Sequence, residues 1–179
     1  MTVRQYIPDS IPAKDRKYFQ DPLPTPEGAE MSVVGSLLID PVNSTIILQR
    51  LGFKRGHFGS EQYRQIFIAA VKCIKRDGTV DLITLREKIS QKQLAMAERC
   101  VECVPTANNI RLYGKLVMEA WERRELMKLA TRIAFRLHEG GNPQTIRKGM
   151  QEWLSKQSEN TGESNTQNGH SRLQKSTTP

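Results

Sequence analysis

The chain has 179 residues, and its 27 basic and 19 acidic residues give a formal net charge of +8. This length suffices for one medium domain with tails, and the positive charge attracts nucleic acid or an acidic protein surface without specifying a fold. No apolar N-terminal segment resembles a signal peptide, and the longest uncharged apolar run, 31–39, is too short to span a bilayer. We therefore expect a soluble, cytoplasmic protein with no membrane partner.

Composition divides the chain into three parts. Residues 1–25 hold four of the nine prolines, which fix φ and remove backbone donors, so we expect an extended, disordered arm. Residues 158–179 are almost entirely polar and are expected to form a disordered tail or linker. Residues 26–157 lack period-two alternation and follow helical spacing, which predicts an all-α domain.

Helix start and stop signals predict a compact multi-helix head over residues 26–105. Pro26 suits the first turn of a helix that ends at Asp40, before a proline. Ser60 and Gly78 suit the two ends of a helix with an apolar stripe, and Asp81 can cap the next helix. The expected helices span about 26–40, 42–51, 60–78, 81–89 and 93–103.

The last third predicts a long αα-hairpin over residues 106–157. Residues 106–139 contain no proline and would form a helix of about 50 Å at about 1.5 Å per residue. Gly140 and Gly141 suit a left-handed stop, and Asn142 and Pro143 suit the start of a second helix that runs to about Gln157. The residues expected to pack are Leu112, Leu116, Leu126, Leu129, Ile133 and Leu137 on the first helix, and Ile146, Met150, Trp153 and Leu154 on the second.

The sequence contains no pattern for catalysis, a cofactor or a metal. The Gly114-Lys115 pair lacks both the upstream glycine and the following Ser or Thr of a phosphate-binding loop, so we expect no ATP turnover and no enzyme activity. Cys100 and Cys103 have the spacing of metal ligands, but no second pair accompanies them and a zinc site needs about four ligands. We interpret these thiols and Cys73 as ordinary cysteines in a reducing cytosol.

Four segments carry a pattern that goes beyond helix signals. Residues 24–41 contain a proline-led Glu27 to Glu30, a short apolar run and then a Gly-Ser-Leu-Leu-x-Asp-Pro sequence. Residues 57–67, 77–85 and 106–113 follow in order, with Arg123-Arg124 after the last. Together they resemble the N-terminal domain of bacterial replicative DNA helicases of the DnaB type. The resemblance covers about 130 residues and does not include the RecA-like motor domain of that family.

The resemblance implies a specific set of partners. In the family, N-terminal domains form an all-α head with a helical hairpin, pair through their hairpins and build a collar on the hexamer. Primase docks on that collar, and in some systems loaders do as well. The resemblance therefore implies self-association as a dimer or a higher ring-like assembly, and binding to a replicative helicase or primase.

Two groups of residues are candidate contact sites. The first is a basic stripe at four-residue spacing, which is either a solvated helix face or a contact for phosphates or an acidic partner. It comprises Arg124, Lys128, Arg132 and Arg136, with Arg123 beside them. The second is a set of large apolar residues on the expected hairpin, which either belong to a core or support self-association. It comprises Tyr113, Trp121, Leu137, Met150 and Trp153.

Three hypotheses about function follow. The first is a non-catalytic DNA replication module that self-associates through the hairpin and binds a helicase or primase. The second is a DNA-binding accessory protein that uses the basic stripe, with affinity that falls steeply with salt. The third is the N-terminal part of a complete ATP-dependent DNA helicase.

Overall fold

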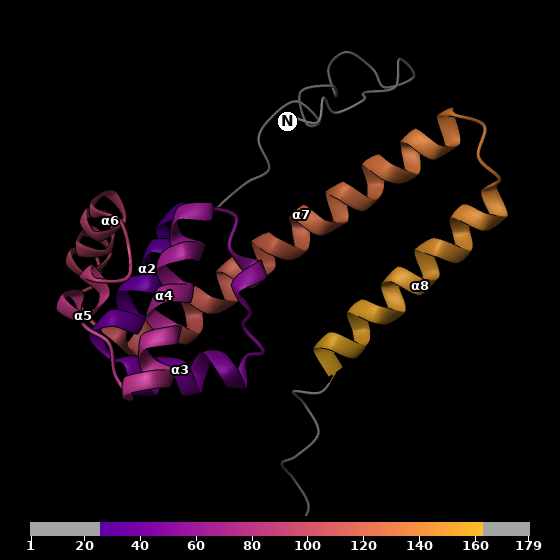
Figure 1. Ribbon diagram of the computed structural model, residues 1–179. Helices are drawn as coiled ribbons and strands as arrows, with labels where there is room; N and C mark the ends of the chain where they lie inside the picture. The colour runs from indigo at the N-terminus through magenta and orange to yellow at the C-terminus, as the bar shows by residue number, and fades with distance from the viewer. Residues whose placement is uncertain (1–25, 163–179) are drawn as a thin grey trace, which may run out of the picture.

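The computed structural model describes residues 26–162, which form helices joined by turns and loops, with no β-strand in that range (Figure 1). The predicted all-α fold is confirmed. The expected arm and most of the expected tail lie outside the described residues. The elements are α2 (Glu27–Ile39), α3 (Pro41–Arg50), the 3₁₀ turn η1 (Arg55–His57), α4 (Glu61–Asp77), α5 (Leu82–Arg86), α6 (Gln91–Glu102), the 3₁₀ turn η2 (Ala107–Asn109), α7 (Ile110–His138) and α8 (Pro143–Gly162).

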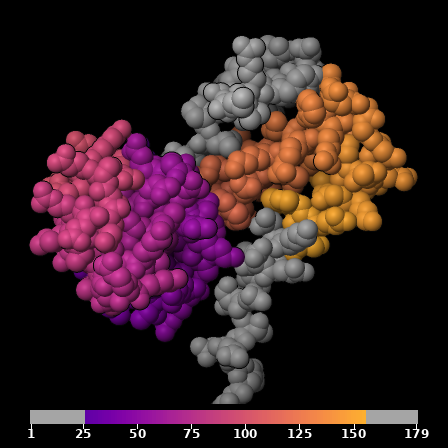
Figure 2. Space-filling model, viewed as in Figure 1, coloured from indigo at the N-terminus to yellow at the C-terminus, as the bar shows by residue number. Residues whose placement is uncertain are grey.

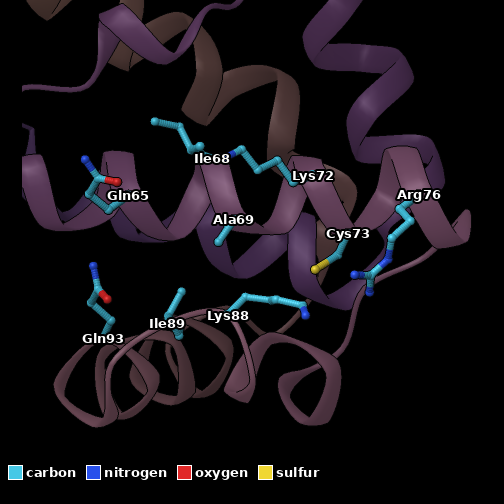
Figure 3. A pocket seen from close by; sticks show the side chains of 9 residues that line it. All are labelled: Gln65, Ile68, Ala69, Lys72, Cys73, Arg76, Lys88, Ile89 and Gln93. Carbon is cyan, nitrogen blue, oxygen red and sulfur yellow. The ribbon is translucent and has the colours of Figure 1, made fainter.

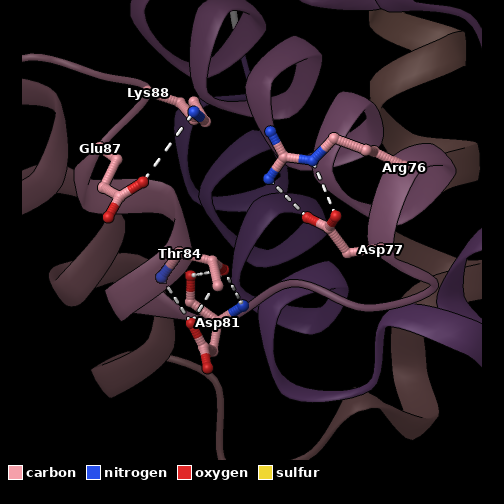
Figure 4. Close-up of polar contacts among 6 residues, drawn as sticks. All are labelled: Arg76, Asp77, Asp81, Thr84, Glu87 and Lys88. Atoms are coloured by element: carbon pink, nitrogen blue, oxygen red, sulfur yellow. Dashed lines mark hydrogen bonds and ion pairs between the residues drawn. The ribbon is translucent and has the colours of Figure 1, made fainter.

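Local capping interactions set most helix ends of the head. Helix α4 stops at Gly78, whose φ of 77° lies in the left-handed region that glycine tolerates. The Asp81 carboxylate accepts a hydrogen bond from the Thr84 N–H at 2.7 Å, and this cap starts α5 (Figure 4). The α5 helix ends at Arg86, earlier than predicted, although Ile89 still packs against the core from the following turn.

The head core is centred on α2, which packs against α3, α4, α6 and α7. Its Val33, Val34 and Leu37 are fully buried. Gly35 allows a close approach between α2 and α6, because a Cβ at this position would collide with the Cys100 carbonyl oxygen. The apolar run predicted to start the domain therefore forms its centre.

Helix α7 is one continuous helix of 29 residues, about 43 Å long, but the face that it turns toward the head differs from the prediction. Leu112 and Leu116 are exposed, whereas a different face of α7 packs on the core. Gly114 is close enough to α3 that an added Cβ would lie 3.1 Å from a methyl group of Leu51. The leucine stripe was the wrong guide here because α7 approaches the head most closely at Gly114, on a face that Leu112 and Leu116 do not share. The α7 residues buried in the head are Ile110, Gly114, Val117, Ala120 and Arg124.

Beyond Arg124, α7 leaves the head and forms the predicted hairpin with α8, which stands apart from the head in space-filling view (Figures 1 and 2). Gly140 adopts a φ of 75°, and the Asn142 side chain accepts a hydrogen bond from the Gln144 N–H at 2.8 Å. Helix α8 continues to Gly162, beyond the expected end at Gln157. Leu154, which was predicted to be buried, is 48% exposed because α8 has α7 as its main neighbour.

Candidate interaction surface

The hairpin has a narrow apolar seam between its two helices. Leu129 and Ile133 of α7 are half-buried, as are Met150 and Trp153 of α8, whereas Ile146 near the turn is buried. A small cavity of about 140 Å³ remains between the two helices, lined in part by these side chains. The seam therefore holds the helices together but covers only one face of each.

Four large apolar residues of the hairpin stay exposed and do not line the cavity between its helices, and we call them the hairpin apolar surface. Each is more than two-fifths exposed. Single exposed apolar residues are common on protein surfaces, but a group on two helices with so few neighbours indicates an interaction site. The hairpin apolar surface comprises Leu126, Phe135, Leu137 and Leu154.

The structure separates the residues predicted for self-association into two groups. Tyr113 packs against the head core, and the ring of Trp121 lies 4.7 Å from the ring of His57. These two residues belong to the part of α7 held by the head. Leu137, Met150 and Trp153 lie on the hairpin, where Leu137 is exposed and the other two face the seam.

The basic stripe is less continuous than its spacing suggested. Arg124 is only 6% exposed, and its Nη2 donates a hydrogen bond to the His57 carbonyl oxygen at 2.5 Å. It therefore cannot act as a surface contact, and that part of the prediction is wrong because α7 presents this position to the head. Arg123 and Lys128 are exposed but already bind Glu119 and Glu125 at 2.5 and 2.7 Å. Arg132 and Arg136 are also exposed.

A buried polar cluster links the start of α2 to the turn before α4. The Glu30 carboxylate is fully buried and accepts hydrogen bonds from the Gly59 and Ser60 N–H groups at 2.6 and 3.0 Å. Sequence reasoning missed this role. The signal was present, since Glu30 is the second acid of the motif shared with the helicase family.

His57 and Arg124 extend this cluster toward α7. The His57 Nδ1 accepts a hydrogen bond from the Lys54 N–H at 3.1 Å, so the ring is held as an acceptor. Burial, reinforced by the positive charges of Lys54 and Arg124, lowers the pKa of His57 from 6.5 to about 4. Burial also lowers the pKa of Arg124, while the negative charge of Glu30 opposes that change. The cluster thus connects the turn before α4 to α7 through His57 and Arg124.

Cys100 and Cys103 lie in different surroundings. Cys100 is buried, and burial raises the pKa of its thiol to about 12, whereas Cys103 is exposed. Within residues 26–162, no three His, Cys, Asp or Glu side chains are grouped so that they could hold a metal ion. None of the helices in this range has the length and apolarity needed to cross a membrane.

Comparison with known proteins places this architecture in a family. The sequence matches replicative DNA helicase DnaB of Geobacillus stearothermophilus with 26% identity over 117 residues, covering 59% of this chain and 24% of the helicase. It matches that of Buchnera aphidicola subsp. Baizongia pistaciae with 28% identity over 118 residues, covering 62% of this chain and 25% of the helicase. The chain thus spans about a quarter of the length of these curated relatives.

A solved structure supports the same fold. The crystal structure of the N-terminal domain of DnaB helicase from Mycobacterium tuberculosis aligns with a TM-score of 0.65 and 22% identity, covering 75% of this chain and 99% of that one. The sequence profile of the DnaB-like helicase N terminal domain matches residues 23–119. This chain therefore belongs to the DnaB-like helicase N-terminal domain family.

Proposed function

We propose that this protein is a non-catalytic DNA replication module that self-associates through the α7–α8 hairpin and binds a replicative helicase or primase. The family membership supports the replication context, since the matched relatives are replicative DNA helicases. The matched region is their N-terminal domain and not an ATPase domain, which supports a non-catalytic role. We further propose that residues 26–157 form the functional domain.

The hairpin apolar surface is the observation that carries the self-association proposal. Leu137 and Leu154 are 49% and 48% exposed on helices that pack mainly on each other. A second copy of the same hairpin would bury these side chains symmetrically, which is the usual route to a closed dimer. The buried anchor at Arg124 positions α7 so that this surface is held away from the head.

The test is the solution mass of the full chain and of a double variant, Leu137→Asp with Leu154→Asp. Light scattering after size exclusion is expected to show a dimer or larger species for the native chain and a monomer for the variant. The matched control is Ile83→Asp in the head, because Ile83 is 79% exposed but lies outside the hairpin. A double variant that keeps the native mass would refute the hairpin interface.

Partner binding requires its own measurement. The immobilised chain is exposed separately to purified replicative helicase and purified primase from the same organism, at low and high salt. Binding that persists at high salt and requires the hairpin supports the proposed role. Binding only to DNA, lost at high salt and reduced by Arg132→Ala with Arg136→Ala, would favour the DNA-binding hypothesis instead.

A further inference from the structure

A groove in the head lies between α4 and the turn that joins α5 to α6 (Figure 3). Its volume is about 400 Å³. The α4 wall is a single helix face, because its lining residues recur every three or four positions from Gln65 to Arg76. Lys88, Ile89 and Gln93 form the opposite wall.

The groove has an apolar base, uncharged polar side chains at one end and basic side chains at the other. Ala69 and Ile89 are half-buried against the head core and leave part of their surface in the groove. Gln65 and Gln93 face one another at one end, and Arg76 and Lys88 reach toward one another at the other end, beside Cys73 (Figure 3). A ligand that fits must therefore present apolar groups at its centre and negative charge at one end.

The lining contains three cations and no carboxylate. Asp77 and Glu87 lie outside the lining, where the Arg76 guanidinium donates to Asp77 at 2.7 and 2.6 Å and the Lys88 ammonium is 4.0 Å from Glu87 (Figure 4). The exposed Lys88–Glu87 contact is at the limit of an ion pair, so Lys88 stays open to an incoming carboxylate, whereas Arg76 holds Asp77 through two hydrogen bonds. Lys72 has no ion pair within the described residues.

We propose that this groove binds a short acidic, amphipathic segment of a partner protein. Carboxylates of the segment would meet Lys72, Arg76 and Lys88, and its apolar side chains would cover Ala69 and Ile89. The carboxamides of Gln65 and Gln93 each offer a donor and an acceptor, which suits the N–H and C=O groups of a peptide backbone.

The same features argue against a nucleic acid as the ligand. A single strand needs cations that follow its backbone and aromatic rings on which bases stack. In this groove Arg76 and Lys88 lie together at one end, Lys72 extends along α4 toward Ile68 (Figure 3), and none of the lining residues is aromatic. An apolar base beside a compact basic end matches an amphipathic peptide better.

The groove lies on the side of the head away from α8 (Figure 1). A partner segment bound there leaves the hairpin apolar surface free, so the two surfaces can be occupied at once. The inference goes beyond the proposed self-association and does not depend on it.

The experiment titrates the full chain with a short synthetic leucine–glutamate peptide and follows backbone amide signals by NMR. We expect chemical-shift changes confined to residues 65–76 and 88–93. A leucine–glutamine peptide of the same length is expected to bind about tenfold more weakly, because it lacks the carboxylates.

Paired charge reversals distinguish peptide binding in the groove from attraction of the peptide to the overall positive charge of the protein. Lys72→Glu with Lys88→Glu is expected to weaken peptide affinity at least about tenfold. The matched control is Lys75→Glu with Lys92→Glu, which changes the net charge by the same amount at exposed positions outside the groove lining. This control should change the peptide affinity by less than about twofold. Neither pair should change the solution mass, which distinguishes this site from the hairpin interface.

Three results would overturn the proposal. The first is an absence of shift changes in the groove at saturating peptide. The second is an equal loss of affinity in both variant pairs, which would indicate attraction to the overall positive charge. The third is displacement of the peptide from these amides by a single-stranded oligonucleotide, which would assign the groove to nucleic acid.

Discussion

The head and the hairpin are built from the same type of element but are stabilised differently. In the head, α2 is surrounded by four helices, and its central apolar side chains are fully buried. In the hairpin, two helices share one seam, and four large apolar residues stay exposed. Helix α7 belongs to both regions, since its first half is buried in the head at Ile110, Gly114 and Val117, whereas its second half has α8 as its neighbour. The comparison shows a densely packed head and a hairpin that leaves much of its apolar surface exposed.

The sharpest test of this difference is truncation of a leucine in each region. Leu37 is completely buried, so Leu37→Ala is expected to lower the free energy of unfolding by about 4 kcal/mol. Leu137→Ala removes the same atoms from a half-exposed site and should cost less than about 1 kcal/mol. Urea unfolding at low protein concentration, where a dimer would dissociate, measures both. Equal losses would contradict the distinction between a packed head and an open hairpin.

Acidic pH is expected to lower the stability of the head and not that of the hairpin. Burial lowers the pKa of His57 to about 4 in the folded chain, from its ordinary value of 6.5 in an unfolded chain. The unfolded state thus binds more protons between these values, so stability is fully present above about pH 6.5 and decreases as the pH falls toward 4. The expected loss over this range is up to about 3 kcal/mol.

Unfolding curves at a series of pH values measure this effect. His57→Asn should flatten the pH dependence between pH 4 and 6.5, because it removes the titrating ring. His138→Asn, which changes an exposed histidine at the end of α7, is the control and should keep the native slope. A native slope in the His57 variant would show that another group controls acid stability.

The anchor between the two regions can be tested at two adjacent arginines. Arg124→Ala removes a buried hydrogen bond to the His57 carbonyl oxygen and is expected to cost about 2 kcal/mol. Arg123→Ala removes only an exposed pair with Glu119 and should change stability by less than about 0.5 kcal/mol. Thermal or urea unfolding compares the two variants, and similar effects would show that burial does not distinguish these positions.

Much of the fold was predictable because its signals are local. Gly78, Asp81 and Asn142 act through their own backbone or through residues two to four positions away, so they mark helix ends without knowledge of the surroundings. The long hairpin and the all-α class followed from these signals and from helical spacing. The ends of α5 and α8 were predicted less well, since neither has a strong stop signal in sequence.

The candidate sites were less predictable for a different reason. Four-residue spacing placed Arg124 in a basic stripe, but the packing of α7 on the head made it a buried anchor. Lys72 and Arg76 share one face of α4, but Lys88 joins them only because α4 faces the α5–α6 turn. No periodicity within one helix reveals which residues a neighbouring helix will cover.

The amino-acid sequence alone established the helices, several of their caps, the hairpin and the resemblance to a helicase N-terminal domain, although Ser60 makes no capping hydrogen bond and the Ser90 cap was missed. These depend on interactions between residues that are close in the chain, or on patterns within one segment. The buried Glu30, the inward Arg124 and the exposed leucines of α7 emerged from the folded structure. They depend on which helix faces which, and that choice is made by shape and close packing across long sequence distances.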